Sequence, residues 1–183
     1  EDVARLGGQA KVNPPIRAQQ EREGLWRHLA AGHITVVSTD HVSWSLDRKT
    51  HANIFDNASG ATGLALLLPL MIDGAAKRGI SLTRIAQVLA YNPARLFSLQ
   101  HQKGALELGR DADLAIVRKA PYVYDAKASS HNYVDWSPYD GREIDYQVSA
   151  TMIRGEWVFK DEQVLSEPGF GQFVRPVHTE VTA

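Results

Sequence analysis

Apolar residues recur at helical spacing along the first half of the chain and predict several helices. Residues 19–31 carry one apolar stripe, and residues 60–78 carry another that Pro69 is expected to kink or split. Ser81 is the expected N-cap of a third helix, and Asn92 is the expected N-cap of a short fourth one. These helices are predicted to lie around one segment whose residues are typical of a strand.

That segment is Ile34–Val37, whose apolar and β-branched residues predict a buried strand running on to Thr39. The strand leads directly into Asp40. An acidic residue at the carboxyl end of a buried strand lies where barrel and open α/β enzymes place their chemistry. Asp40 is therefore the first candidate for a functional residue, and the alternative is an N-cap or turn aspartate. The polar and small residues Asp40–Ser59 predict a long loop, which is more often functional than idle.

The pattern changes after residue 103, where short strands replace helices. Strands are predicted at 114–117, 148–154 and 156–159, and the stretch 119–143 has the composition of a loop. The chain is therefore divided into two predicted parts. Residues 1–103 hold the helices and the first strand, and residues 104–183 hold the later strands and a carboxy-terminal tail.

Composition narrows the class of protein. Hydrophobic residues make up 44% and charged residues 22% of the 183 residues, a balance typical of a globular protein. The net charge of −1 favours neither nucleic acid nor an anionic membrane as a partner. The longest apolar stretch, 64–72, is far shorter than the ~20 residues of a membrane span. The chain has no cysteine, which excludes disulfides and thiolate metal sites within it and predicts a cytoplasmic protein.

Several short motifs follow one another in a fixed order. They are K-V-N-P-P-I-R, G-x-I-x-V-V-S-T-D-H, G-A-T-G-L, N-P-A-R-L-F and K-G-A-L-E-L-G-R-D-A-D-L-A-I-V, then S-P-Y-D-G, T-M-I-R-G-E-W-V-F and G-F-G-Q-F-V. Together they resemble the cyclic-amide amidohydrolases, which are the relatives of hydantoinase (dihydropyrimidinase), allantoinase and dihydroorotase. The resemblance covers nearly the whole chain.

The resemblance implies an α/β fold, a metal-dependent (β/α)8 barrel flanked by a small β-sandwich. This chain would supply the carboxy-terminal part: the last barrel strand, its helices and the sandwich strands. A whole barrel takes ~250 residues. The chain also opens with Glu1 rather than Met, so we expect a missing amino-terminal barrel portion as its partner. Relatives commonly form homo-oligomers, so a dimer or tetramer is expected too.

The resemblance also implies a metal centre and a role for Asp40. In the family two metals, usually zinc, are held by a His-x-His pair, a carboxylated lysine, two further histidines and one aspartate. The seven histidines of this chain never stand two apart, so Asp40 is the one ligand that matches. Asp40 would bind metal and act as the catalytic residue, taking a proton from the attacking water and giving it to the leaving nitrogen. His41, next in the chain, is expected to be a packing residue.

Three further residues are expected to bind the substrate, a small cyclic amide. Asn13 lies in the motif that contacts the substrate ring in relatives, with a turn asparagine as the alternative. Asn57 lies where hydantoinases hold substrate, although the match is partial. Trp44 replaces a histidine that holds the substrate carboxylate in dihydroorotases, which favours hydantoin, allantoin or a dihydropyrimidine over dihydroorotate. Arg48 and Lys49 are expected to be solvated or structural.

Two other classes of protein remain open at this point. A catalytically inactive dihydropyrimidinase-like protein would keep the fold and work as a scaffold or interaction protein. An independent β-rich binding module with a helical head is the other alternative. Bound metal separates the enzyme from the scaffold.

Overall fold

The computed structural model describes residues 2–129 and 133–177, so His131, His178 and the end of the predicted tail lie outside the described residues. The α-helices are α1 (Asp2–Leu6), α2 (Gln19–Ala30), α3 (Leu67–Ala76), α4 (Leu82–Ala86) and α5 (Asn92–Leu96). The 3-10 turns are η1 (Gly7–Ala10), η2 (Leu46–Lys49), η3 (Ile54–Asp56) and η4 (Leu64–Leu66), and η5 (Gln87–Tyr91) is a π turn. The strands are β1 (Leu114–Val123), β2 (Glu143–Ile153), β3 (Glu156–Lys160) and β4 (Gln163–Val164).

Helices α2 and α4 confirm the two helices that the spacing of apolar residues predicts at 19–31 and after Ser81. Ser81 caps α4 as predicted, since its hydroxyl oxygen accepts from the Arg84 amide at 3.2 Å. Pro69 lies in the first turn of α3, just after η4, where its missing N–H leaves no hydrogen bond broken. The helical stretch therefore changes from 3-10 to α ahead of the proline, and Pro69 is accommodated inside α3.

The expectation that Asn92 caps a separate helix is wrong. The π turn η5 joins α4 to α5 without a break, so Asn92 has helical backbone angles. Its side-chain amide instead donates to the carbonyl of Thr35 at 2.7 Å, while the amide of Val37 donates to the carbonyl of Val88 at 3.1 Å. The π turn thus lies against the predicted strand and holds it from one side.

The segment 34–39 makes no strand ladder with any other described residue, contrary to prediction. A β-strand needs a neighbouring strand to take its backbone hydrogen bonds. The described residues provide an isolated parallel bridge, between His41 and Ala61, just beyond the end of the run.

The carboxy-terminal half forms one antiparallel sheet in the order β1-β2-β3-β4. The register runs from Leu114 opposite Met152 to Val123 opposite Glu143, with a bulge near Pro121. Strand β1 therefore extends to Val123, and the loop predicted at 119–143 begins later than expected. The tight turn predicted at Gly155 is confirmed, with φ of 51° at Arg154 and 83° at Gly155.

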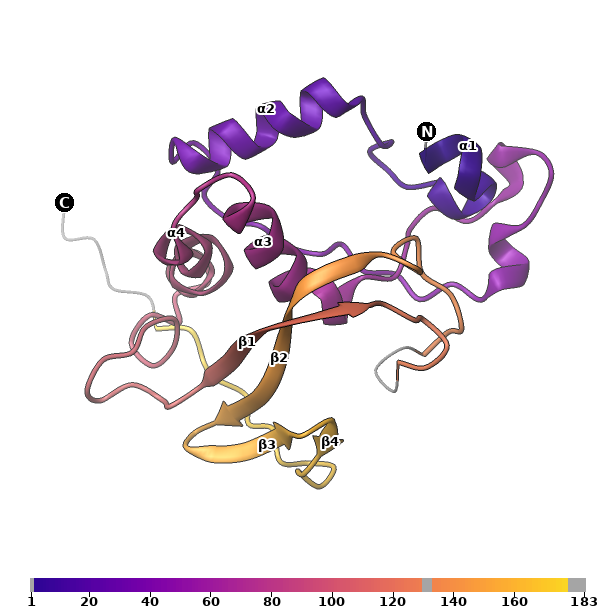
Figure 1. Ribbon diagram of the computed structural model, residues 1–183. Coiled ribbons are helices and arrows are strands. Elements are labelled where there is room, and N and C mark those ends of the chain that lie inside the picture. Colours follow the sequence, from indigo (N-terminus) through magenta and orange to yellow (C-terminus); the bar gives the residue numbers. More distant parts are fainter. Residues whose placement is uncertain (1, 130–132, 178–183) are drawn as a thin grey trace.

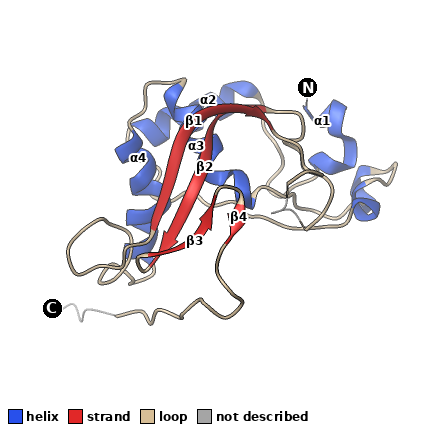
Figure 2. Cartoon of the chain, turned by 60° about the horizontal axis from the view of Figure 1, so that its bottom comes forward, coloured by secondary structure: helices blue, strands red, loops and turns tan. Residues whose placement is uncertain are grey.

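Helices α2, α3 and α4 lie over one side of the long β1–β2 hairpin (Figures 1 and 2). The core beneath them contains Leu29, Ile72, Ala75, Ile85 and Val88, against which Val117 and Tyr146 of the hairpin pack. A second cluster joins Leu66 to Tyr124, Ala126 and Ile144. The two predicted parts of the chain therefore share their apolar core across residue 103.

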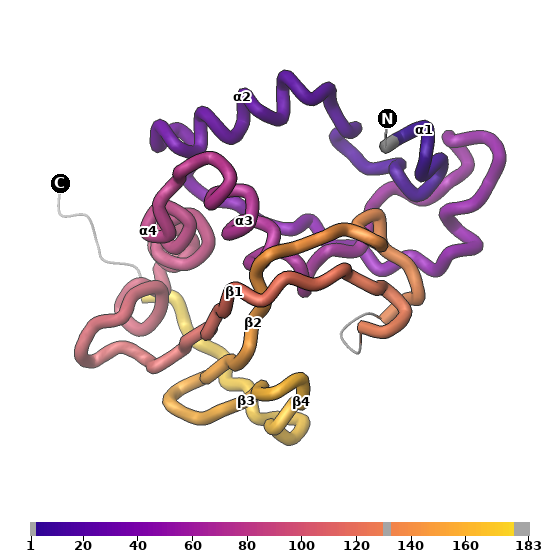
Figure 3. The backbone as a smooth tube through the Cα atoms, viewed as in Figure 1, coloured from indigo at the N-terminus to yellow at the C-terminus, as the bar shows by residue number. Residues whose placement is uncertain are grey.

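The amino-terminal residues lie apart from this core. Figure 3 shows α1 beside the loop that carries η2 and η3, at the opposite end of the molecule from α4. The Lys11 ammonium donates to the carbonyl of Phe55 at 2.7 Å, which ties the two segments together.

Among residues 2–129 and 133–177, no helix combines the length and the apolar character needed to cross a membrane.

Candidate active site

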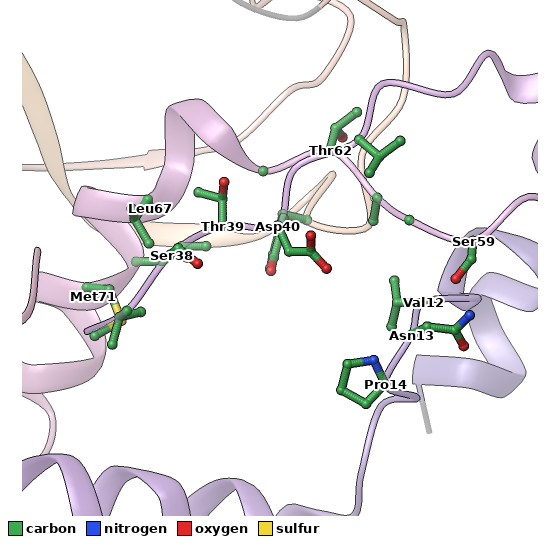
Figure 4. A pocket seen from close by; sticks show the side chains of 17 residues that line it. Val12, Asn13, Pro14, Ser38, Thr39, Asp40, Ser59, Thr62, Leu67 and Met71 are labelled. Atoms are coloured by element: carbon green, nitrogen blue, oxygen red, sulfur yellow. The ribbon is translucent and has the colours of Figure 1, made fainter. Parts of the chain in front are cut away.

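An open pocket of about 600 Å³ lies at the end of the 34–39 segment. Figure 4 shows Ser38, Leu67 and Met71 on one side, and Val12, Asn13, Pro14 and Ser59 on the other, with Asp40 and Thr62 between them. Tyr139, from the loop between β1 and β2, completes the lining. Four segments that are distant in sequence thus meet around one carboxylate.

Asp40 projects into this pocket from a bend in the chain (Figure 4). Its φ of 47° lies in the left-handed region, which aspartate adopts more readily than most residues. The bend ends the 34–39 run and turns the following residues toward Ala61, where the amide of Val42 donates to the Ala61 carbonyl at 3.0 Å. The side chain of Asp40 is exposed and therefore accessible to a ligand.

His41 is held by the protein on both ring nitrogens. Its Nδ1 accepts from the amides of Gly63 at 3.1 Å and Leu64 at 3.2 Å, and its Nε2 lies 2.7 Å from the hydroxyl of Ser43. A nitrogen that accepts two hydrogen bonds carries no proton, so the proton of a neutral ring is on Nε2. His41 is not among the lining residues and orders the start of η4, as expected for a packing residue.

The structure brings one of the three predicted substrate-binding residues to the pocket. Asn13 belongs to the lining and is exposed. Asn57 is 3% exposed and does not line the pocket. Its amide nitrogen donates to the carbonyls of His51 and Asn53, both at 3.0 Å, and its oxygen accepts from the His51 amide at 2.9 Å. Its side chain is thus used to close its own loop.

Trp44 does not line the pocket either, and its side chain is bound by other residues of the loop. Its indole N–H donates to the carbonyl of Ser59 at 2.8 Å, and the guanidinium of Arg48 lies 4.1 Å from its ring centre. Its own carbonyl accepts from the indole of Trp136 at 2.8 Å. Trp44 therefore packs the loop behind the pocket, and Arg48 covers it.

Most of the lining residues were not singled out as site residues from the sequence, Tyr139 and Thr62 among them. The Thr62 hydroxyl donates to the carbonyl of Trp136 at 3.1 Å. Gly63 keeps the approach to Tyr139 open, since a Cβ there would lie 3.2 Å from the tyrosine ring. Tyr139 stands in the S-P-Y-D-G motif, which was the available signal.

The described residues contain no group of three or more His, Cys, Asp or Glu side chains able to hold a metal ion. The pocket lining offers one carboxylate, that of Asp40. A carboxylate oxygen is a suitable ligand for zinc. The donor set described here thus fits one position of a metal centre and no more.

Residues 5–158 match the model of the amidohydrolase family. The chain belongs to this family. An allantoinase of Rubrobacter xylanophilus is 38% identical over 177 residues, which cover 96% of this chain and 38% of that protein. An L-hydantoinase of Paenarthrobacter aurescens is 34% identical over 180 residues, covering 95% and 39%. A dihydroorotase of Halobacterium salinarum is 36% identical over 170 residues, covering 92% and 39%.

Comparison with solved structures shows that the similarity includes the fold. The L-hydantoinase from Arthrobacter aurescens superposes with a TM-score of 0.89 at 35% identity, over 94% of this chain and 39% of that one. A D-hydantoinase superposes with a TM-score of 0.86 at 29% identity, over 92% and 37%. The resemblance found in the motifs is thus confirmed, as is the fold class of a barrel amidohydrolase. The chain spans about 38% of the length of the allantoinase.

Proposed function

We propose that the protein containing this chain is a metal-dependent hydrolase that opens a cyclic amide, with hydantoin, allantoin or a dihydropyrimidine as substrate. The observation that carries the proposal is the exposed carboxylate of Asp40 in the open pocket of an amidohydrolase chain. The names of the similar proteins support the reaction class, since allantoinase and L-hydantoinase occur among them.

In this proposal Asp40 has two tasks. It is one ligand of a metal centre, which we take to contain two zinc ions, and the other ligands lie outside the described residues. A zinc ion bound there would act as a Lewis acid and lower the pKa of a water to ~7. Asp40 itself would accept the proton of the attacking water and return it to the ring nitrogen as the C–N bond breaks.

The rest of the lining would bind and orient the ring. Of the 17 lining residues that the structure describes, Asp40 carries the one charged side chain. Asn13, Ser38 and Thr39 offer neutral polar groups, while Leu67, Leu70 and Met71 form an apolar side. This mixture suits an uncharged cyclic amide better than a ring that bears a carboxylate, so dihydroorotate is the less favoured substrate. Homo-oligomer formation and a cytoplasmic location remain predictions.

The test is a substrate panel applied to the full-length protein loaded with zinc. Hydantoins, allantoin, dihydrouracil and dihydroorotate are compared for the wild type, Asp40→Asn and Asp56→Asn. Asp40→Asn removes a proton acceptor and a ligand, so kcat/KM should fall by about 10² to 10⁴. Asp56 is exposed and not among the lining residues, so Asp56→Asn is the matched control and should keep full activity.

Bound metal is measured on the same samples. Hydrolysis of a hydantoin, allantoin or dihydrouracil by the wild type, with about two zinc per site, supports the proposal. Absence of metal and of turnover on every substrate would instead support the catalytically inactive scaffold. Full activity in Asp40→Asn would contradict the role of this carboxylate.

A further inference from the structure

Lys49 is the largest fully buried side chain of the described residues, with 1% of its surface exposed. Its ammonium donates to three backbone carbonyls: Lys11 at 2.8 Å, Ala58 at 2.7 Å and Gly60 at 2.8 Å. A lysine ammonium has three donors and no acceptor, so the protonated group uses every donor it has. Lysine is almost never fully buried without a paired charge, and a lysine held by carbonyls alone therefore calls for a reason.

The three carbonyls lie in two segments of one side of the pocket. Lys11 precedes Val12, Asn13 and Pro14, while Ala58 and Gly60 flank Ser59. We call residues 12–14 together with 59–60 the Asn13 wall; all of them line the pocket, opposite Ser38, Leu67 and Met71 (Figure 4). The amide of Gly60 also donates to the carbonyl of Lys11 at 3.0 Å. Lys49 therefore joins the two halves of this wall from behind, outside the pocket itself.

The wall is in turn connected to Asp40. Ala61 follows the wall directly, and it forms the parallel bridge with His41 and accepts from the amide of Val42. The end of the wall is therefore bonded to the residues that follow Asp40. The wall otherwise has little apolar burial to hold it, because Asn13 and Pro14 are exposed.

Two effects act in opposite directions on the protonated form of Lys49. Burial, and then the positive charge of Lys11, lower the pKa of Lys49 below its ordinary 10.5. The ring of Trp136 lies 5.8 Å from the ammonium and favours the cation. A neutral amine would lose one of its donors and leave one of the three carbonyls without its partner.

We propose that Lys49 is a positioning residue, which fixes the Asn13 wall at the distance from Asp40 that the substrate ring requires. The effect on turnover rests on the proposed function, whereas the effect on the wall does not. A misplacement of about 1 Å at a binding wall can cost about 10²-fold in rate. Lys49 does not contact the substrate and acts through its hydrogen bonds to the backbone carbonyls of residues 11, 58 and 60.

The experiment uses the full-length protein and compares Lys49→Met with the wild type. Methionine keeps an unbranched stem of similar length but donates no hydrogen bond. Lys49→Arg keeps the charge, but its planar donors cannot meet three converging carbonyls in the same way, so it should restore part of the loss. Val158→Ala, in the buried side of β3 and away from the pocket, is the control for a general loss of stability.

Hydrogen exchange is read first, because it does not depend on any substrate. In Lys49→Met the peptides covering 11–17 and 58–63 should exchange at least about tenfold faster, while peptides of β1 and β2 exchange as in the wild type. Steady-state kinetics on the best substrate follow. We expect kcat/KM to fall about 10- to 100-fold, mainly through KM, with zinc content unchanged because Asp40 lies outside the wall.

The outcomes separate the two proposals. Faster exchange confined to the wall supports the role of Lys49 even if the wild type opens no cyclic amide, in which case the proposed function alone fails. Unchanged exchange of the wall, or faster exchange spread over the chain as in Val158→Ala, overturns the role of Lys49. A cyclic amidohydrolase whose KM is unaffected in Lys49→Met would overturn it too. Should Lys49→Met not fold, the same comparisons are made with Lys49→Arg, whose wall exchange must lie above that of the wild type.

Discussion

The helical core and the pocket loop are held together by different kinds of contact. Between α2, α3, α4 and the β1–β2 hairpin, the buried residues are apolar: Leu29, Ile72, Ala75, Ile85 and Val88. In the loop 41–63 the buried side chains are polar, namely Lys49, Asn57 and Thr62, and each is hydrogen-bonded to backbone. The core is thus stabilised by burial of apolar surface, and the loop by individual hydrogen bonds.

This difference has a consequence for how each region responds to change. Apolar packing is distributed over many contacts, so its loss lowers the stability of the whole fold. A buried polar group instead acts on the few backbone atoms that it binds, and its loss leaves those atoms unpaired. We therefore expect core substitutions to change global unfolding, and loop substitutions to change the pocket with a smaller effect on global unfolding.

The largest effect is expected from Ile85→Ala. Ile85 is 2% exposed and packs in the centre of the helical core, so truncation leaves a cavity and should cost about 2–5 kcal/mol of unfolding free energy. The measurement is urea unfolding of the full-length protein, with KM for the best substrate determined in parallel. Leu82→Ala, at an exposed position of the same helix, α4, is the control and should change stability little. A large rise in KM without loss of stability would contradict the distinction between the two regions.

A smaller and more local effect is expected from Asn57→Ala. The substitution removes hydrogen bonds to His51 and Asn53, which should cost about 1–3 kcal/mol, and it should expose the loop to limited proteolysis between residues 45 and 57. Asn53→Ala is the control, because the Asn53 side chain makes a hydrogen bond, to the Phe55 amide at 3.1 Å, in an exposed position. Loss of substrate binding with an intact, protease-resistant loop would instead favour the direct substrate contact predicted from the sequence.

The same contrast explains which features could be predicted from the sequence. Apolar spacing identifies α2 and α4 and the short strands because burial of a face imposes a period on the chain. Asp40, which the motif singles out, lines the pocket, and its catalytic and metal-binding roles stay predictions. The predicted strand 34–39 failed as a ladder because a strand is defined by a partner, which the described residues do not supply.

Other features of the pocket loop could not be predicted, for a physical reason. Nothing local distinguishes Lys49 from the exposed Arg48 beside it, because its burial depends on carbonyls at residues 11, 58 and 60. Asn57 and Trp44 are expected at the substrate because the resemblance aligns them with substrate-binding positions of the family. The fold instead engages both of them with nearby backbone groups.

The smallest effect is expected where the helical half meets the sheet, at a cluster that is polar without being deeply buried. The ammonium of Lys103 lies 2.7 Å from the Asp111 carboxylate and 2.5 Å from that of Asp113. The hydrogen bond from Lys103 lowers the pKa of Asp111 below its ordinary 3.8, although burial opposes the shift. Burial lowers the pKa of Lys103, but its hydrogen bonds to the two carboxylates outweigh this and raise it above 10.5.

These two shifts predict a pH dependence with a definite sign. A carboxyl whose pKa is lowered by folding contributes stability above its unfolded pKa and loses it as the pH falls through the folded value. A lysine whose pKa is raised contributes stability below 10.5 and loses it as the pH rises through the folded value. The urea midpoint of the wild type should therefore exceed that of Lys103→Met between about pH 5 and 9, and the two should converge below about pH 3 and above about pH 11. Lys127→Met, at an exposed position, should follow the wild type at every pH. A gap for Lys103→Met that stays constant with pH would contradict the electrostatic origin of its effect on stability.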